Sequence, residues 1–265
     1  MTIPLENIDK IRKTRGISIS RLLKVSDAGK YEAVIFDLHH TILRLYPSRG
    51  KIYQNIFRTY GLNISPLRIE RAFRATWRKY GDKKIAKEMI GLTSKNKNEQ
   101  WWSNFHGQML QSLGYYNHKK VAQISLEISK KFYSDPQCHR PYHDAIAILK
   151  LLRQKGIPMA LASNGYHTTR RIIRAYSLER YFRYIFLSEE TGISKPDPKA
   201  FITCAKFLGV ATKKVLVVGD SYTCDILGAK NAGCGAAIID RANRKDKKHK
   251  GCIYLNNLHQ IRGLV

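Results

Sequence analysis

The feature that most restricts the fold of this chain is a series of short apolar runs, each followed by reactive polar side chains. The first run, residues 33–38, carries Asp37 near its end. Continuous apolar runs of this length are typical of strands that are buried on both faces of a parallel sheet. Later runs at 159–163, 184–188, 215–219 and 236–239 alternate with helical patterns at 142–154, 167–176, 197–208 and 223–232. This alternation predicts an α/β fold with a Rossmann-like parallel sheet and crossover helices.

A helical insertion interrupts the pattern after the first strand. Apolar residues recur at helical spacing near 50–60, 66–80, 99–113 and 118–133, so four inserted helices are expected. We expect these four helices to form a separate unit, a cap, beside the α/β core. The predicted division is a basic N-terminal extension at 1–30, the core at 31–45 and 141–240, the four-helix cap at 46–140 and a basic C-terminal segment at 241–265.

Cysteine usage and the lengths of the apolar runs indicate the cellular compartment of the protein. The 5 cysteines form no CxxC pair, which indicates neither a disulfide framework nor a structural zinc site and favours a reducing compartment. No apolar run is long enough to cross a bilayer, so no membrane partner is expected. Residues 10–30 are basic and contain Ser and Thr, as in a mitochondrial presequence, although Glu6, Asp9 and Asp27 oppose this reading. The mitochondrial matrix is favoured, and the cytoplasm stays open.

Positive charge is in large excess, because 47 Lys and Arg against 20 Asp and Glu give a net charge of +27. The excess extends along the whole chain instead of forming a tail, which favours a protein surrounded by a polyanion such as RNA. A solvated basic surface on a free protein is the alternative. Basic clusters of this kind would contact phosphates without reading sequence. The predicted RNA-contacting residues are Arg71, Arg74, Arg78, Arg170, Arg171, Arg174, Arg244, Lys245, Lys247 and Lys248.

Reactive residues collect where the predicted strands end. Asp37, Ser163 and Asp220 each end an apolar run, and Lys195 lies in a loop before a helix. Ligands of open parallel sheets bind beyond the carboxyl ends of the strands. Carboxylate oxygens suit Mg²⁺, whereas Lys and Ser orient a phosphate. We therefore expect a site for Mg²⁺ and a phosphoryl group at this edge.

Four segments carry a resemblance to a known family: FDLHHT at 36–41, SNG at 163–165, KPDP at 195–198 and GDSYTCD at 219–225. In this order they resemble the motifs of the haloacid dehalogenase-like (HAD) superfamily. The helical insertion, with Trp101-Trp102, is similar to the cap of its rhythmically expressed gene-like subgroup. The resemblance implies an α/β HAD fold with Mg²⁺ as cofactor and Asp37 as the nucleophile that forms an aspartyl-phosphate. It further implies phosphate binding by Thr41, Ser163, Asn164 and Lys195, and metal binding by Asp37, the backbone carbonyl of His39, Asp220 and Asp225.

The first motif departs from the family at two positions. HAD phosphatases generally have a second Asp two residues after the nucleophile as general acid and base, where this chain has His39, and His40 replaces the following glycine. Losing a general acid costs typically about 10²- to 10⁴-fold in rate. His39 could shuttle protons, because an unperturbed imidazole titrates near about 6.5.

Two hypotheses follow from this departure. The first is a noncatalytic, RNA-contacting subunit of a ribonucleoprotein such as a mitochondrial ribosome, in contact with RNA and neighbouring proteins. The second is a Mg²⁺-dependent phosphatase acting on a small phosphorylated substrate with His39 as its acid and base.

Overall fold

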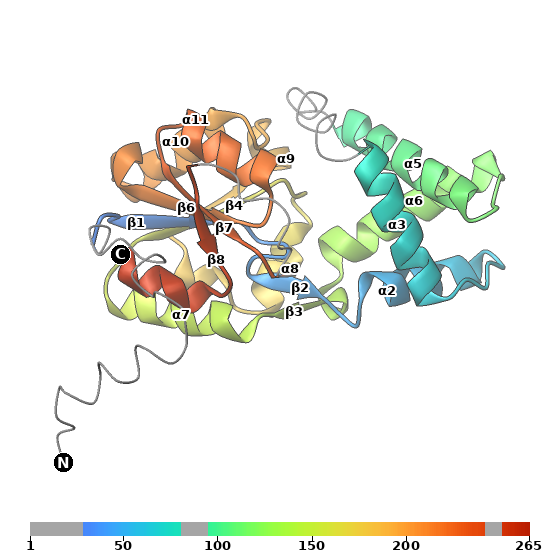
Figure 1. Cartoon of the computed structure of the whole chain (residues 1–265), viewed down its shortest axis with the longest axis horizontal. Coiled ribbons are helices and arrows are strands. Elements are labelled where there is room, and N and C mark those ends of the chain that lie inside the picture. The colour runs from blue at the N-terminus through green and yellow to red at the C-terminus, as the bar shows by residue number, and fades with distance from the viewer. Residues whose placement is uncertain (1–28, 81–94, 242–250) are drawn as a thin grey trace, which may run out of the picture.

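The computed structural model of the chain describes residues 29–80, 95–241 and 251–265. A six-stranded sheet forms the centre of the larger lobe: β1 (Ala33–Phe36), β4 (Met159–Ser163), β5 (Tyr184–Leu187), β6 (Val215–Gly219), β7 (Gly235–Ile239) and β8 (Ile253–Leu255). The spatial order is β5-β4-β1-β6-β7-β8, and every neighbouring pair is parallel (Figure 1). The predicted α/β class with a parallel sheet is confirmed. Because β1 lies between β4 and β6, the residues that follow these three strands meet at one edge.

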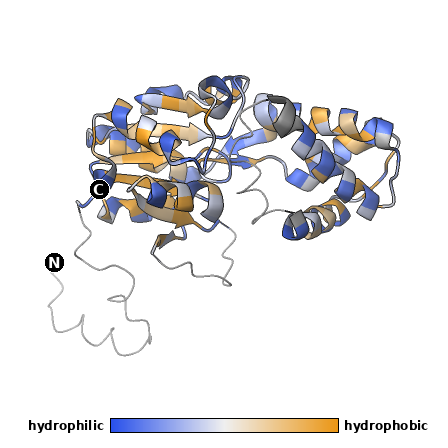
Figure 2. Ribbon diagram, turned by 90° about the horizontal axis from the view of Figure 1, so that it is seen from above, coloured by the Kyte–Doolittle hydropathy of each residue, from blue (hydrophilic) through white to orange (hydrophobic). Residues whose placement is uncertain are grey.

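Helices cover both faces of the sheet: α7 (His143–Gln154), α8 (Thr169–Ala175) and the 3-10 helix Leu258–Gly263 on one face, and α10 (Pro198–Leu208) and α11 (Gly228–Asn231) on the other. The strand β1 serves both faces, because Val34 and Phe36 belong to one apolar cluster and Ala33 and Ile35 to the other. Burying one such aliphatic side chain contributes roughly 1.5 to 3 kcal/mol. The strands accordingly appear as a hydrophobic layer between helices in Figure 2.

Four further helices form a second lobe: α2 (Arg49–Thr59), α3 (Pro66–Tyr80), α5 (Lys95–Ser112) and α6 (His118–Ser134). They share an apolar cluster of their own, which includes the fully buried Phe57 and Met109. The helices α2 and α6 begin at Ser48 and Asn117, whose side chains accept hydrogen bonds from backbone N–H groups of the first turn. None of the described helices is both long and apolar enough to span a membrane.

Tryptophans of this lobe pack against one another. The ring centroids of Trp101 and Trp102 lie 4.9 Å apart, and Trp77 stacks on Phe73. These residues belong to or border the apolar cluster of the lobe. The aromatic residues therefore pack the core of the lobe.

A two-stranded antiparallel ribbon joins the lobes. It consists of β2 (Leu43–Leu45), directly after the first motif, and β3 (His139–Pro141), directly after the last helix of the insertion. The ribbon lies between the sheet and the four helices in Figure 1. Its strands have only three residues each, which is too short for a recognisable alternation of apolar and polar residues, so the sequence does not predict them.

The structure extends and corrects two other parts of the sequence analysis. The strand β8 pairs with β7 and the following 3-10 helix packs on α7, so the core continues beyond residue 240 into the predicted basic C-terminal segment at 241–265. The single helix predicted at 223–232 is instead a π-helix, Tyr222–Leu227, followed by α11. The wider turn arises because the N–H groups of Asp225 and Ile226 both donate to the carbonyl oxygen of Ser221.

Candidate active site

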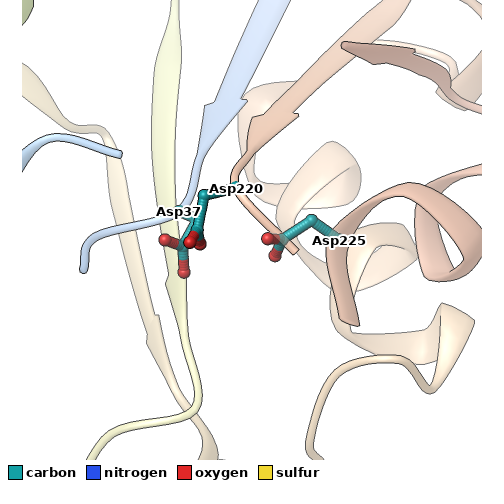
Figure 3. Close-up of side chains that lie close together, drawn as sticks. All are labelled: Asp37, Asp220 and Asp225. Carbon is teal, nitrogen blue, oxygen red and sulfur yellow. The ribbon is translucent and has the colours of Figure 1, made fainter. Parts of the chain in front are cut away.

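Three carboxylates meet at the carboxyl edge of the sheet. Asp37 follows β1, Asp220 follows β6, and Asp225 lies on the π-helix. One ligand oxygen from each lies within 4.8 Å of the others. In Figure 3, Asp37 and Asp220 lie together and the carboxylate of Asp225 points toward them from the following helix. The parallel pairing of β1 with β6 brings the first two together, and the π-helix turns the third back toward them.

Lys195 connects two of these carboxylates. Its Nζ donates to Oδ1 of Asp37 at 2.7 Å and to Oδ1 of Asp225 at 2.6 Å, and its side chain is almost fully buried. Three carboxylates and one ammonium leave two formal negative charges, which suits a divalent cation. The second oxygen of Asp37, Oδ2, is buried and accepts no hydrogen bond from any described residue. The donor set of carboxylate oxygens and this unpaired acceptor fit Mg²⁺.

Burial and charge act in opposite directions on this cluster. Desolvation raises the pKa of Asp225 to about 6, although the ammonium of Lys195 lowers it. Desolvation also disfavours the charged form of Lys195, but attraction to Asp225 and Asp37 is stronger and raises its pKa above the ordinary value. Lys195 therefore stays positively charged at neutral pH and offers a fixed cation to a bound anion.

Asn164 holds the loop that carries Lys195. Its Nδ2 donates to the carbonyl oxygen of Lys195 at 2.8 Å, and its Oδ1 accepts from the backbone N–H of Lys195 at 2.8 Å. Each end of its amide makes one bond of this reciprocal pair, and the phosphate-binding role that the resemblance implied for Asn164 stays a prediction. The side chain of Ser163, at the end of β4, is buried and takes no part in the pair.

Two further residues shape the site without having been singled out from the sequence. A Cβ at Gly219 would collide with the carboxylate of Asp225, so only glycine fits at the end of β6. The backbone N–H of Ser221 donates to Oδ2 of Asp225 at 3.0 Å. Both lie inside the fourth motif, but their roles depend on the conformation of the loop and carry no signal in residue type alone.

His39 is enclosed at the junction of the lobes. Its ring centroid lies 5.3 Å from that of His139 and 5.7 Å from that of Tyr133, and its Nε2 is buried without a described partner. Desolvation, followed by the charges of His139, His40 and Lys195, holds the pKa of His39 well below its usual 6.5, although a hydrogen bond to the backbone of Phe132 opposes this. The expectation of an unperturbed imidazole at His39 is therefore wrong. The enclosed ring is neutral at pH 7, so it has a lone pair to accept a proton but no second proton to donate.

His40 and Thr41 complete the turn after Asp37. His40 has a φ of 61°, in the left-handed region that favours glycine, which explains why a glycine suits this position. Thr41 is fully buried, and its carbonyl oxygen accepts a hydrogen bond from Nη2 of Arg241 at 2.7 Å. Its side-chain Oγ1 is buried without a described partner, so the phosphate-binding role that the resemblance implied stays a prediction.

The predicted RNA-contacting arginines have different surroundings. Arg71, Arg74 and Arg78 are exposed on α3. Arg170 forms a two-bonded ion pair with Glu190 of the short helix Ser188–Thr191, and Arg174 pairs with Glu179 of the 3-10 helix Glu179–Tyr181. Arg171 is exposed. The remaining predicted residues, Arg244, Lys245, Lys247 and Lys248, lie outside the described residues.

Comparison with known proteins identifies the family. The family model of the haloacid dehalogenase-like hydrolases matches residues 31–233. The chain belongs to this family. The human haloacid dehalogenase-like hydrolase domain-containing protein 3 is 27% identical over 204 residues, which are 77% of this chain and 80% of that protein. The rhythmically expressed gene 2 protein of Drosophila melanogaster is 22% identical over 80% of this chain and 84% of its own length, so the resemblance to that subgroup is confirmed.

Other HAD proteins are similar over comparable lengths. A phosphoserine phosphatase of Thermus thermophilus is 26% identical over 80% of this chain and 90% of its own length. Among solved structures, the HAD hydrolase YfnB of Bacillus subtilis, bound to magnesium, superposes with a TM-score of 0.70 at 20% identity, covering 88% of this chain and 97% of YfnB. The superposition covers both lobes and agrees with a HAD fold that carries a helical cap.

Proposed function

We propose that this protein is a Mg²⁺-dependent phosphomonoester hydrolase that uses Asp37 as its nucleophile. The observation that carries the proposal is the convergence of Asp37, Asp220 and Asp225 around the buried ammonium of Lys195. A structural ion-pair network would satisfy its acceptors, whereas here Asp37 Oδ2 is buried without a described partner. The family membership and the phosphatase among its relatives agree with this chemistry.

Each side chain has a defined part in the proposed reaction. Asp37 attacks the phosphorus of the substrate, forming an aspartyl-phosphate as the alcohol leaves, and water then hydrolyses this intermediate to regenerate the carboxylate. Lys195 faces the phosphoryl oxygens with a permanent positive charge, and Ser163 supplies a hydroxyl donor. Mg²⁺, held by Asp37, Asp220 and Asp225, would neutralise charge between nucleophile and phosphate.

His39 limits the proposed reaction at two points. A neutral imidazole does not protonate the departing alcohol, so phosphoryl transfer from an alkyl ester is slow. Its buried lone pair on Nε2 is poorly placed to activate water, so hydrolysis of the aspartyl-phosphate is slow as well. A missing acid and base together account for a rate deficit of about 10²- to 10⁴-fold.

The test compares two substrates with different leaving groups. p-Nitrophenolate departs without protonation, whereas an alkoxide needs a proton, so in a single turnover the wild-type protein should transfer the phosphoryl group to Asp37 much faster from p-nitrophenyl phosphate than from an alkyl phosphate. His39→Asp should raise this single-turnover rate by about 10²-fold or more for the alkyl phosphate and by less for the aryl phosphate. Asp37→Asn serves as the inactive control. Equal gains for both substrates, or activity without Mg²⁺, would overturn the proposal.

A noncatalytic role in contact with RNA is the second candidate, and the charge of +27 favours it. Arg68, Arg71, Arg74 and Arg78 are all exposed on α3, which supports a basic stripe along that helix. A mitochondrial ribosome is the proposed host. Sedimentation of native extract with and without ribonuclease tests this role, since an RNA-bound subunit runs with large particles and is released by ribonuclease. A protein that sediments at 30.5 kDa in both cases is no such subunit.

A further inference from the structure

A pocket lies on the ribbon that joins the two lobes. It has a volume of about 570 Å³ and is lined by Arg44, Tyr46 and Arg140 of the ribbon region and by Tyr142, His143 and Asn257 of the core. None of the four residues Asp37, Lys195, Asp220 and Asp225 lines it. The pocket is therefore separate from the candidate active site.

Two cationic side chains stand directly opposite each other in this pocket. Arg44 on β2 is the register partner of Arg140 on β3. Like charges at directly opposite positions of an antiparallel pair are unfavourable. A ribbon of three-residue strands has few other contacts to offset such repulsion, so the pair needs a further explanation.

The contacts of the two guanidinium groups do not neutralise their charge. Both lie over the ring of Tyr46, with Cζ of Arg44 at 5.6 Å and Cζ of Arg140 at 4.4 Å from its centroid. Arg140 donates to the carbonyl oxygen of His139 and to the hydroxyl of Tyr176, which are neutral acceptors. Within residues 29–80, 95–241 and 251–265, no carboxylate forms an ion pair with either arginine.

The acid among the residues that line the pocket is paired with another group. Asp144 lines the same pocket, but its Oδ2 accepts from Nη1 of Arg241 at 2.6 Å and from the N–H of Leu258 at 2.8 Å. The pocket thus keeps two positive charges that Tyr46 orients and nothing described balances. Two guanidinium groups that no carboxylate neutralises are suited to phosphate oxygens, which they bind through parallel N–H donors.

We propose that this pocket binds a phosphodiester of a single-stranded RNA. Arg44, Tyr46 and His143 are exposed, so a continuous strand can cross the pocket without entering a closed cavity. The overall charge of +27 attracts a polyanion more strongly than a small phosphate. A strand bound here contacts the ribbon on one side and the start of α7 on the other, so it bridges the ribbon and the core.

The experiment uses the full chain and a short RNA that contains 4-thiouridine. Arg44→Glu should weaken binding about tenfold and reduce the slope of log Kd against log salt by about 1. Arg153→Glu, an exposed charge reversal near the far end of α7, is the matched control and should change Kd by less than about twofold. Photo-crosslinks should map to the peptide that contains Tyr46 and disappear in Arg44→Glu only. Thermal melting of both variants verifies that they remain folded.

The other outcomes reject the proposal. Equal losses in Arg44→Glu and Arg153→Glu, or crosslinks confined to α3, would mean that RNA binds elsewhere through general charge. Binding of AMP that depends on Arg44, together with no Arg44-dependent binding of RNA, would assign the pocket to a small phosphorylated ligand. Neither result depends on phosphatase activity, so the pocket and the catalytic proposal are tested separately.

Discussion

Two buried polar clusters, one in each lobe, differ in how completely their atoms are paired. In the cap, Nε2 of His106 lies 2.9 Å from the hydroxyl of Tyr53, and its Nδ1 lies 2.7 Å from Oγ of Ser125. In the core, Lys195 bridges Asp37 and Asp225, but Oδ2 of Asp37 has no described partner. The cap cluster is neutral and closed, whereas the core cluster is charged and incomplete.

This difference separates a structural network from a binding site. A closed network contributes stability and specificity to the packing of the cap, and nothing in it calls for a ligand. An incomplete, charged cluster costs free energy in the free protein and recovers it when a cation and a phosphate bind. Substitutions in the core cluster should therefore change activity, metal binding and stability, whereas substitutions in the cap cluster should change stability alone.

The largest expected effect is on turnover in the core. Asp37→Asn removes the nucleophile and should reduce the hydrolysis of p-nitrophenyl phosphate by at least about 10³-fold. Replacing Tyr53 by Phe in the cap should leave the same rate within about threefold, since that hydroxyl belongs to the closed network. Initial rates at saturating Mg²⁺ measure both. A similar loss in both variants would remove the distinction between the clusters.

The second effect is on the stability of the core cluster. Lys195→Met leaves Asp37 and Asp225 as uncompensated buried carboxylates and should lower the free energy of unfolding by about 3 to 5 kcal/mol. Mg²⁺ should restore part of this loss, because it supplies the missing positive charge. Denaturant titration with and without Mg²⁺ measures the effect, and Lys199→Met, at an exposed position, is the control. No recovery with Mg²⁺ would argue against a metal at these carboxylates.

The third effect is a pH dependence of the free energy of unfolding, which arises from a histidine of the cap. Burial lowers the pKa of His106 to about 3, below the 6.5 of an unfolded chain. The unfolded chain therefore binds the extra proton between these values, so stability is full above pH 6.5 and falls as the pH decreases. Between pH 7 and 5 His106 contributes about 2 kcal/mol of this loss. The pKa values of His39 and His139 are also lowered, so they add to the slope. His106→Gln should reduce the slope by about one proton in urea titrations, whereas an unchanged slope would contradict the assignment.

The smallest effect is the loss of one hydrogen bond in the cap. Tyr53→Phe leaves Nε2 of His106 unpaired and should cost about 1 to 2 kcal/mol, without a change in Mg²⁺ affinity. Tyr116→Phe, whose ring is 68% exposed, should cost almost nothing. Thermal melting and a Mg²⁺ titration of each variant give the two readouts. A change in Mg²⁺ affinity in Tyr53→Phe would show that the clusters are coupled.

The sequence predicts the parts of the molecule that depend on residue pattern. Apolar runs ended by Asp37, Ser163 and Asp220 identify buried parallel strands and their common edge, because side-chain burial determines that pattern directly. The positions of Asp225 and Lys195 are different. Their proximity depends on a π-helix and a loop held by Asn164, and these backbone conformations have no periodic signal.

The sequence does not predict side-chain environments that only tertiary contacts create. His39 titrates normally in a peptide, and its low pKa arises from enclosure by residues such as Tyr133 and His139, which are distant in sequence. The strand β8 has only three residues and follows a basic run, so no apolar pattern in the sequence identifies it as a strand. Arg44 and Arg140 lie far apart in the chain, and only the register of the ribbon makes them a pair.

The most direct test of the core cluster is covalent labelling of Asp37. The protein is incubated with Mg²⁺ and radiolabelled acetyl phosphate and quenched in acid, and the labelled peptide is identified. We predict a Mg²⁺-dependent label on Asp37 that persists in the wild-type protein, turns over quickly in His39→Asp and is absent from Asp37→Asn. A wild-type protein and a His39→Asp variant that both remain unlabelled, or a label that survives in Asp37→Asn, would contradict a phosphoryl-transfer site at Asp37.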